Sequence, residues 1–336
     1  MPRPGVVLGV NLVVCAAGLA WVLSRFGGDA LRLLTTQASV TTLLAFAAVV
    51  AAAFVAFARR WQLLLGGLDV RLGLGRLTGF RAAGQSLSSL IPSAKLGGEP
   101  LRVWLLTEDG VGAPAAVTSV IIDRTLEIAS STAFGVLFAG LLARRGVPAL
   151  QGALVTVSLA TFGIVVGIVV TVRRLRRGAG LVSAAVRATG LAETRAVAGR
   201  MGVIEDAEVL AARLVDERPR MMRALGYGLL ANALVLLEYH LLLAAFGLPS
   251  SPLAVVAATF ATGAAHSFPV PAGVGVLEGA QMWLFQVLGH PPEVGLAVGL
   301  AVRMRELVWV LPGLGVLLAR FARGDLRAGH PGAERP

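Results

Sequence analysis

The sequence predicts an all-α polytopic membrane protein with about six full spans plus two re-entrant helical hairpins, arranged as an inverted repeat. Three observations predict this fold. The 336 residues are 56% hydrophobic and only 15% charged, with a mean hydropathy of +0.78, whereas soluble domains are about 25% charged. Several apolar stretches reach the roughly 20 residues that a helix needs to cross a bilayer. Two further apolar regions, interrupted by proline and glycine, recur at a fixed interval.

Six apolar stretches are expected to cross the membrane as helices. They are residues 6–24, 40–58, 115–142, 150–172, 224–246 and 294–319. The first resembles a signal peptide, because Arg3 precedes a hydrophobic run, and Cys15 suggests a lipoprotein. Since Val14 is too large for the residue before a lipidated cysteine, we interpret this stretch as a retained span.

The two broken regions, 80–106 and 254–288, have proline- and glycine-rich centres between shorter apolar arms. Proline lacks a backbone donor and interrupts a helix. Irregular backbone at membrane depth is tolerated only inside protein or beside a water-filled cavity. We therefore predict a re-entrant hairpin in each region, with hinges at Pro92, Gly97, Gly98, Pro269, Pro271, Gly273 and Gly275.

The basic residues predict the orientation. The chain has 30 Lys and Arg against 19 Asp and Glu. With a cytoplasmic N-terminus, 21 of the 30 fall on the cytoplasmic side and four outside, as the positive-inside rule requires. We expect a bacterial-type cytoplasmic membrane and cytoplasmic termini, with no nucleic-acid partner. The 21 comprise Arg3, a cluster of Arg59, Arg60, Arg71, Arg76 and Arg81, the loop 173–223 and the C-terminal tail.

Residues 1–320 are expected to form one membrane domain. Within it, the loop 173–223 has mixed charges and helical apolar spacing, so we expect a cytoplasmic amphipathic segment near the lipid headgroups. A partner-binding surface is the alternative for this loop. Residues 321–336 are expected to be a disordered cytoplasmic tail.

The internal repeat has an interval of 179 residues. This shift superposes Glu99 on Glu278, Arg124 on Arg303, and Glu127 on Glu306. Such matches are informative because charges are scarce in these segments. The repeats are expected over about 40–142 and 224–319, and the orientation runs them through the membrane in opposite directions. Inverted repeats with broken helices are typical of transporters.

The charges inside these segments have two interpretations, which the sequence leaves open. Arg124 and Glu127 are three residues apart and share a helix face. An isolated charge at the bilayer centre costs at least about 2.5–3.5 kcal/mol. The charges are therefore either ion pairs that hold the hairpins or the lining of a polar route for an anionic or zwitterionic headgroup. The candidates are Lys95, Glu99, Arg102, Asp123, Arg124, Glu127, Glu278, Arg303, Arg305 and Glu306.

Two smaller groups of residues also remain open. Lys95 and Arg102 flank Gly97, Gly98 and Glu99, which suggests a phosphate site or side chains that extend to the cytoplasmic surface. Separately, the pair Glu238 and His240 suggests a proton relay or hydrogen bonds between helices.

Catalytic and cofactor motifs are not found. The single cysteine excludes an intramolecular disulfide and a cysteine-based metal cluster. The four histidines have no ligand spacing, and no nucleophile–base set, phosphate-binding loop, zinc motif or haem motif occurs. We expect no metal, no cofactor and no enzymatic activity.

Two segments resemble the transmembrane region of the lysylphosphatidylglycerol synthases. They are Ile91–Arg102 followed by Val120–Arg124, and Pro269–Glu278. The resemblance covers about residues 6–320, and it implies a flippase-like protein that moves lipids between leaflets. It points to Glu99, Arg102, Asp123, Arg124 and Glu278. Bifunctional members carry a soluble aminoacyl-transferase domain after this region, which we do not expect here.

The leading hypothesis is a lipid translocator without an ATP site, in which Arg124 and Arg303 bind the headgroup phosphate. Its substrate would be an anionic or zwitterionic phospholipid, a glycolipid or a hopanoid-type lipid. One alternative is a non-transporting scaffold for a lipid-modifying or glycosyl-transferring enzyme. Another is a membrane enzyme that acts on a lipid phosphate.

Overall fold

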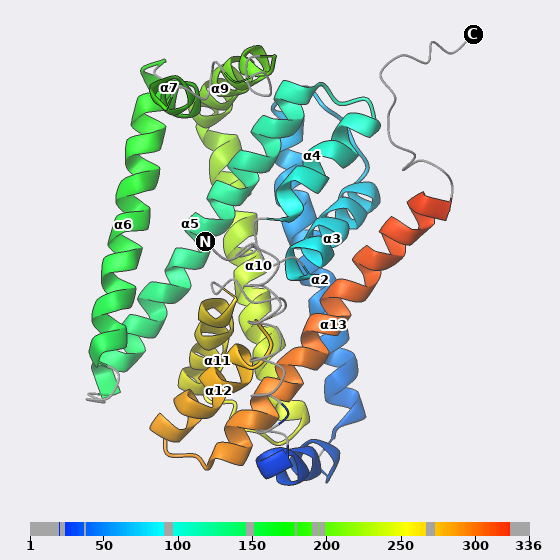
Figure 1. Ribbon diagram of the computed structural model, residues 1–336, viewed down its shortest axis with the longest axis vertical. Helices are drawn as coiled ribbons and strands as arrows, with labels where there is room; N and C mark the ends of the chain where they lie inside the picture. The colour runs from blue at the N-terminus through cyan, green and yellow to red at the C-terminus, as the bar shows by residue number, and fades with distance from the viewer. Residues whose placement is uncertain are drawn as a thin grey trace.

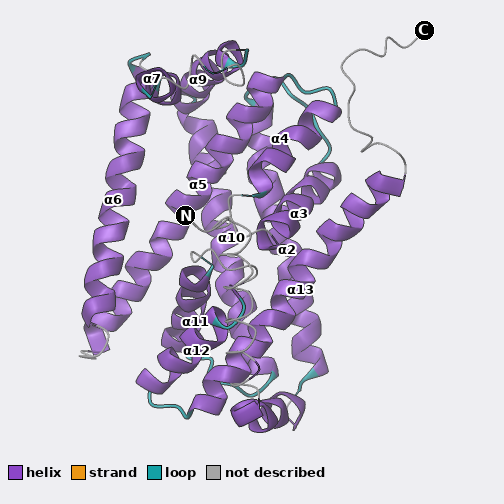
Figure 2. Ribbon diagram, viewed as in Figure 1, coloured by secondary structure: helices purple, strands orange, loops and turns teal. Residues whose placement is uncertain are grey.

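The computed structural model describes residues 20, 24–36, 38–90, 97–145, 151–178, 180–189, 194, 199–266 and 273–322. The regular elements in these ranges are helices, and the ranges contain no strand (Figures 1 and 2). A helix over residues 24–36 precedes the labelled ones. The labelled helices are α2 (Val40–Gly66), α3 (Leu74–Leu90), α4 (Gly98–Glu108), α5 (Ala113–Arg145), α6 (Gln151–Arg176), α7 (Leu181–Ala188), α9 (Met201–Asp216), α10 (Arg218–Ala245), α11 (Pro252–Ala265), α12 (Val276–Val287) and α13 (Pro292–Ala322).

The fold class predicted from the sequence is confirmed as an all-α membrane protein. Among the described residues, α2, α10 and the Leu154–Arg176 part of α6 are long and apolar enough to cross a bilayer. Helices α5 and α13 are longer still, at 33 and 31 residues, but carry charges near their middles. The predicted span 6–24 and the predicted tail lie almost entirely outside the described residues.

Both broken regions contain two short helices, as predicted. Helices α3 and α4 form the first pair, and α11 and α12 form the second. Gly98 begins α4 beside α3, where a Cβ would lie 2.1 Å from the Gly84 carbonyl oxygen, so the glycine permits this close approach. Of the predicted hinge residues, Gly273 and Gly275 have φ of +60° and +79°. Pro92, Lys95, Pro269 and Pro271 lie outside the described residues.

The helix bounds repeat at the interval of 179 residues. Adding 179 to the bounds of α2, α4 and α5 gives 219–245, 277–287 and 292–324. The observed bounds of α10, α12 and α13 are 218–245, 276–287 and 292–322. Figure 1 shows α3 and α4 toward one end of the long axis and α11 and α12 toward the other. The structure thus has equivalent helices at opposite ends, as an inverted repeat requires.

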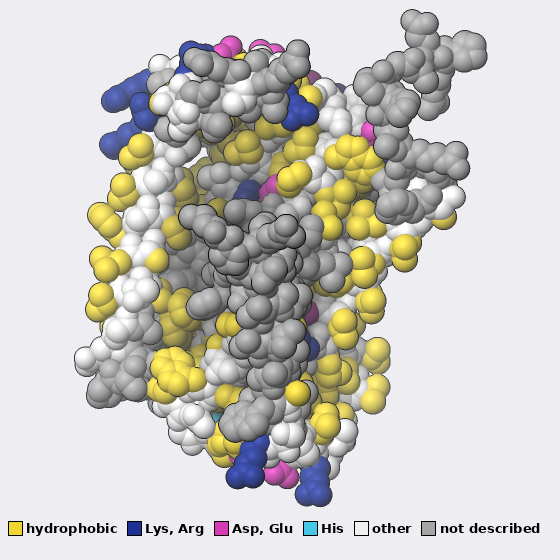
Figure 3. Space-filling view, viewed as in Figure 1, with side chains coloured by type: hydrophobic (Ala, Val, Ile, Leu, Met, Phe, Trp, Pro, Cys, Tyr) yellow, Lys and Arg dark blue, Asp and Glu magenta, His cyan; other side chains and the backbone are white. Residues whose placement is uncertain are grey.

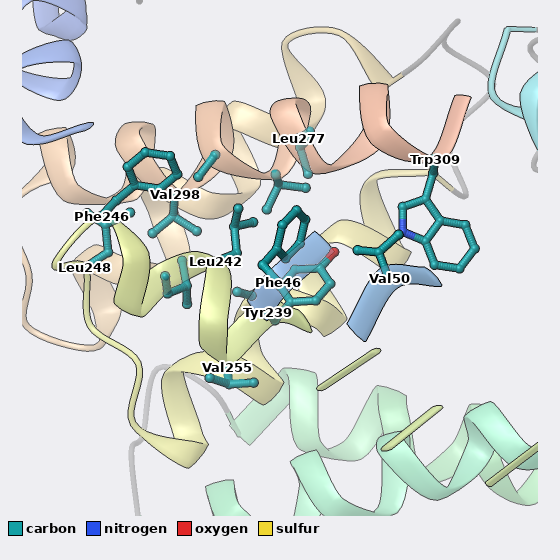
Figure 4. Close-up of a cluster of buried hydrophobic side chains, with 14 of the residues drawn as sticks. Phe46, Val50, Tyr239, Leu242, Phe246, Leu248, Val255, Leu277, Val298 and Trp309 are labelled. Atoms are coloured by element: carbon teal, nitrogen blue, oxygen red, sulfur yellow. The ribbon is translucent and has the colours of Figure 1, made fainter. Parts of the chain in front are cut away.

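The two halves pack closely against each other. Helix α2 packs along α10, α3 packs against α13, and α5 contacts α11. The largest apolar core joins these helices and includes Phe46 and Val50 of α2, Leu242 of α10 and Val298 of α13 (Figure 4). The hairpins are therefore fixed by contacts with the opposite half, and not only by their own connections.

Charged and apolar side chains are separated on the visible face of the molecule (Figure 3). Most of the visible charged side chains lie near the two ends, and hydrophobic side chains are visible mainly along both sides of the molecule between these ends. Helix α6 stands at the side of the molecule (Figure 1), and few of its residues are buried. Its basic last turn ends beside α7 and α9, the helices within the predicted amphipathic loop.

Candidate functional site

The charges predicted to repeat form one Glu–Arg–Glu triad in each half. In the first half, Arg124 Nη1 donates to Glu127 Oε1 at 2.8 Å, and its Nε lies 3.4 Å from Glu99 Oε1. Arg124 and Glu127 are one turn apart on α5, whereas Glu99 comes from the first turn of α4. The hairpin carboxylate and the long helix therefore hold the same guanidinium.

The second triad repeats this arrangement with shorter contacts. Arg303 Nε donates to Glu278 Oε1 at 2.7 Å, and its Nη1 donates to Glu306 Oε2 at 2.8 Å. Its Nη2 also donates to the carbonyl oxygen of Gly273 at 2.9 Å. Arg303 therefore bonds two carboxylates and a carbonyl, whereas Arg124 Nε has no hydrogen-bond partner among the described residues.

A buried basic cluster surrounds Asp123 in the first half. Arg60 Nε donates to Oδ1 at 2.7 Å, while Arg81 Nη1 and Arg102 Nη2 donate to Oδ2 at 2.9 and 2.7 Å. Arg81 Nη2 also donates to Glu127 Oε2 at 2.5 Å, which joins the cluster to the first triad. We call these residues, Arg60, Arg81, Arg102 and Asp123, the Asp123 cluster.

Two of the arginines assigned to the cytoplasmic side are buried within the protein. The Arg60 side chain is fully buried, and that of Arg81 is 8% exposed. Helix α2 continues to Gly66, beyond the predicted end of the span at 58, and so carries Arg60 inside the protein. Arg102 is also buried and bonded to Asp123, so it does not extend to the surface. Sequence reasoning thus missed Arg60 and Arg81 as interior residues.

The second half has a different buried ion pair. Arg305 Nε and Nη2 lie 2.7 and 2.6 Å from Glu238 Oε2, which also accepts from Trp309 Nε1 at 3.3 Å. Of the two interpretations left open for Glu238 and His240, hydrogen bonds between helices agree with Glu238 of α10, which bonds residues of α13. His240 is exposed, and its Nδ1 contacts the carbonyl oxygen of Ser250. Residues two positions apart, such as 238 and 240, point to different sides of a helix.

The Asp123 cluster occurs in the first half only. At the four equivalent positions, 179 residues later in the chain, every one of these charged residues is replaced by an uncharged residue. A buried charge is costly unless it is paired, so the four side chains would have to change as a set. The equivalents of Arg60, Arg81, Arg102 and Asp123 are Tyr239, Phe260, Gln281 and Val302.

A cavity of about 770 Å³ lies between the halves. Charged side chains from both halves line it, with hydroxyl, amide and apolar groups over the rest of its wall. Helix α6 contributes Val157 and Ile164 to this wall, and α10 contributes Asn232. The charged and titratable side chains of the wall are Arg81, Arg124, Glu127, Tyr239, His266, Arg305 and Glu306.

The cavity separates the predicted site residues into two groups. Arg124, Glu127, Arg305 and Glu306 line it. The remaining candidates with described positions do not line the cavity. They bond to residues that line it or to one another, and they are Glu99, Arg102, Asp123, Glu278 and Arg303. Among the described residues, no group of three or more His, Cys, Asp or Glu could hold a metal ion.

His266 is a cavity residue that the sequence did not predict. It follows α11, and its Nε2 lies 2.7 Å from Glu306 Oε1. The two residues are 40 positions apart, one directly after α11 and the other in α13, so no local spacing signals the contact. Position 87, its equivalent in the first half, is a leucine, so the repeat does not signal it either.

Comparisons with known proteins agree with this architecture. Residues 6–313 match the profile of the family described as the lysylphosphatidylglycerol synthase TM region. The chain is also 22% identical over 271 residues to a UPF0104 membrane protein of Methanothermobacter thermautotrophicus. That alignment covers 77% of this chain and 79% of the relative.

Proposed function

The chain belongs to the lysylphosphatidylglycerol synthase TM region family, and from this premise we propose that it translocates a membrane lipid between leaflets. The single observation that carries the proposal is the cavity between the halves, which is lined by arginines and carboxylates of both. An anionic or zwitterionic headgroup would pass through this cavity while its acyl chains remain in the bilayer. Phospholipids, glycolipids and hopanoid-type lipids with such headgroups are the proposed substrates.

The size and lining of the cavity support a headgroup as its occupant. A volume of about 770 Å³ lies within the roughly 300–1,000 Å³ of small-molecule sites. Such sites are mostly apolar and have a few polar groups that orient the ligand. Here the polar groups are charged side chains, and apolar residues of α5, α6 and α11 provide the rest of the wall, against which the upper part of the lipid would lie.

Arg124 is the residue best suited to the headgroup phosphate. Its side chain is 25% exposed, and its contact with Glu99 is 3.4 Å long. A guanidinium donates two parallel hydrogen bonds to a phosphate, and such pairs are among the strongest in proteins. Glu127 holds Arg124 and Arg81, so an arriving phosphate would exchange with a carboxylate that is already there.

Arg305 is the corresponding cation of the second half. It lines the cavity, whereas Arg303, its neighbour on α13, is not among the lining residues. In this proposal Arg305, and not Arg303 as first expected, binds the headgroup phosphate in the second half. Arg303 would position Glu306.

The ion-paired groups of the two halves also differ in their balance of charge. The described group of the first half contains four arginines and three carboxylates, and that of the second half contains two arginines and three carboxylates. This difference suits a headgroup that carries both a positive and a negative charge.

Orientation and energy source are part of the proposal. The basic end of α6 lies at the same end of the molecule as α3 and α4 (Figure 1), which supports placing this end and both termini in the cytoplasm. We propose that transport runs downhill or on an ion gradient, without hydrolysis of a nucleotide and without chemical change of the lipid. A scaffold for a lipid-modifying enzyme is the competing hypothesis.

The proposal is tested with purified protein in vesicles that contain a fluorescent phospholipid, where an impermeant quencher reports arrival at the outer leaflet. Arg124→Ala should slow lipid movement about tenfold, because a charge-assisted hydrogen bond contributes about 1.5–3 kcal/mol. Arg144→Ala is the matched control, since Arg144 is exposed near the end of the same helix. Equal rates for the wild type and Arg124→Ala would contradict the phosphate role. Vesicles in which the wild type moves no lipid, but an enzyme co-purifies stoichiometrically, would favour the scaffold.

A further inference from the structure

The hydrogen bonds of His266 determine where its protons are. Its Nδ1 lies 2.7 Å from the carbonyl oxygen of Thr262, one turn earlier in α11. A carbonyl oxygen has no hydrogen to donate, so Nδ1 must carry the proton of this bond. In a neutral imidazole the other nitrogen, Nε2, is then an acceptor.

This acceptor faces a second acceptor. Nε2 lies 2.7 Å from Glu306 Oε1, and an ionised carboxylate is acceptor-only. Two acceptors this close need a proton between them, on Nε2 as imidazolium or on Oε1 as carboxylic acid. We propose that the His266–Glu306 pair binds one exchangeable proton as a second ligand of the cavity, and that lipid movement is coupled to this proton. The coupling rests on the proposed lipid transport, but the proton site itself does not.

The position of the pair allows the proton to exchange. Both residues line the cavity, and the Glu306 side chain is 19% exposed. The second oxygen of Glu306, Oε2, accepts from Arg303, and Arg303 in turn bonds Glu278. A network that extends to the α12 hairpin helix therefore fixes the carboxylate in place, so a proton that leaves the pair enters the cavity and leaves an ordered anion behind.

Other charged groups surround the pair. On α13 itself they are Arg303 and Arg305. The groups on the other helices packed against α11 and α13 are Arg81 of α3, Arg124 and Glu127 of α5, Glu238 and Tyr239 of α10, and Glu278 of α12. An anionic headgroup that enters this cavity would favour the protonated pair, since opposite charges attract strongly where water is scarce. Binding of the two ligands would then be reciprocal, each strengthening the other.

The two halves differ at this point, which would give the coupling a direction. Glu127, the equivalent of Glu306, is bonded by Arg60 and Arg81, which remain charged at any physiological pH. Glu306 instead faces a histidine, the side chain whose charge changes between about pH 5 and 8. Among the described residues, therefore, Glu306 has a histidine partner and Glu127 does not.

The test combines nitrogen NMR of histidine-labelled protein in nanodiscs with lipid movement measured at several pH values. Glu306→Gln is the informative variant, because its amide can donate to Nε2 in place of the bound proton and does not titrate. For the wild type we expect Nδ1 to stay protonated while the Nε2 signal and the rate of lipid movement change with pH. In Glu306→Gln both should be independent of pH.

His240→Asn is the control, since His240 is exposed and outside the cavity; it should keep the wild-type pH profile. His266→Gln assigns the NMR signal. A wild-type His266 without a proton at Nδ1, or a Glu306→Gln pH profile equal to that of the wild type, would overturn the proposal. If the wild type moved no lipid but its His266 signal titrated only with Glu306 present, the proton site would stand and the transport function would fail.

Discussion

Arg60 Nε donates to Asp123 Oδ1 at 2.7 Å, and the side chains of both residues are fully buried. The bond joins α2 to α5 in the first half, and it lies within a cluster that the second half lacks. Cation–π contacts support the cluster, with the Arg102 guanidinium 4.0 Å from the Trp61 ring centroid and that of Arg81 4.3 Å from the Phe57 ring centroid. Several predictions depend on this buried arrangement.

Neutralising Asp123 should destabilise the protein strongly. In Asp123→Asn, three guanidinium groups lose the carboxylate that they share, and breaking a buried ion pair costs about 3–5 kcal/mol. The measurement is thermal unfolding in detergent, where a clearly lower midpoint is expected. Arg59→Ala is the control, because the Arg59 side chain is exposed and donates to Gln62 outside the cluster. An unchanged midpoint in Asp123→Asn would show that the cluster is not a stabilising network.

Replacing the whole Asp123 cluster should cost less than breaking it. The combination R60Y/R81F/R102Q/D123V installs the residues found at the equivalent positions of the second half. Buried ion clusters exchanged for packed uncharged residues are often neutral in stability. We expect the fourfold variant to unfold at a higher temperature than D123V alone. A fourfold variant that unfolds at or below the temperature of D123V alone would contradict this prediction.

The approach of α4 to α3 should tolerate no side chain at Gly98. A Cβ there would lie 2.1 Å from the Gly84 carbonyl oxygen and 2.5 Å from Ser88 Oγ, so Gly98→Ala must push the hairpin helices apart. Overpacking of this kind typically costs about 1–3 kcal/mol. Gly75→Ala in α3 is the control, because nothing lies within 4 Å of its Cβ and alanine favours a helix by up to about 1 kcal/mol. The thermal unfolding midpoints of the two variants are compared. If Gly98→Ala were as stable as Gly75→Ala, the close contact between α4 and α3 at Gly98 would be contradicted.

Glu238 should control the position of Arg305 in the cavity wall. In Glu238→Gln, the Arg305 guanidinium and Trp309 Nε1 lose their shared anion, although the amide oxygen can still accept one hydrogen bond. We expect a shift of tryptophan emission and slower lipid movement, with a smaller loss of stability than for Asp123→Asn, since one cation loses its partner and not three. If the tryptophan emission shifted but the rate of lipid movement did not change, the Glu238–Arg305 pair would have a structural role only, and the prediction would be contradicted.

Much of the fold follows from the sequence because hydropathy and helix length are local properties. The apolar runs at 115–142 and 294–319 predicted α5 and α13 closely. The repeat interval predicted that Glu99 and Arg124, and likewise Glu278 and Arg303, would occupy equivalent positions, and each pair is in contact. This succeeded because charges are rare in membrane segments, so their repetition is informative.

The errors concern residues whose position depends on packing between distant helices. Arg60 follows Arg59 after an apolar run, a pattern typical of a helix end at the cytoplasmic surface. The apolar residues that follow, Trp61 and Leu63–Leu65, were the signal that α2 continues. The contact between His266 and Glu306 joins two helices of the second half, and a single sequence holds no signal for it. The cavity itself arises from the packing of both halves.

The central claim, that a headgroup crosses through the cavity, is tested most directly by filling the cavity from α6. Ala160 lines the cavity, whereas Val165 of the same helix is exposed and is not among the lining residues. In vesicles with a fluorescent phospholipid, Ala160→Trp should abolish lipid movement, and Val165→Trp should move lipid at the wild-type rate. If Ala160→Trp moves lipid as fast as the wild type, or if wild-type vesicles are no faster than protein-free ones, the account is contradicted.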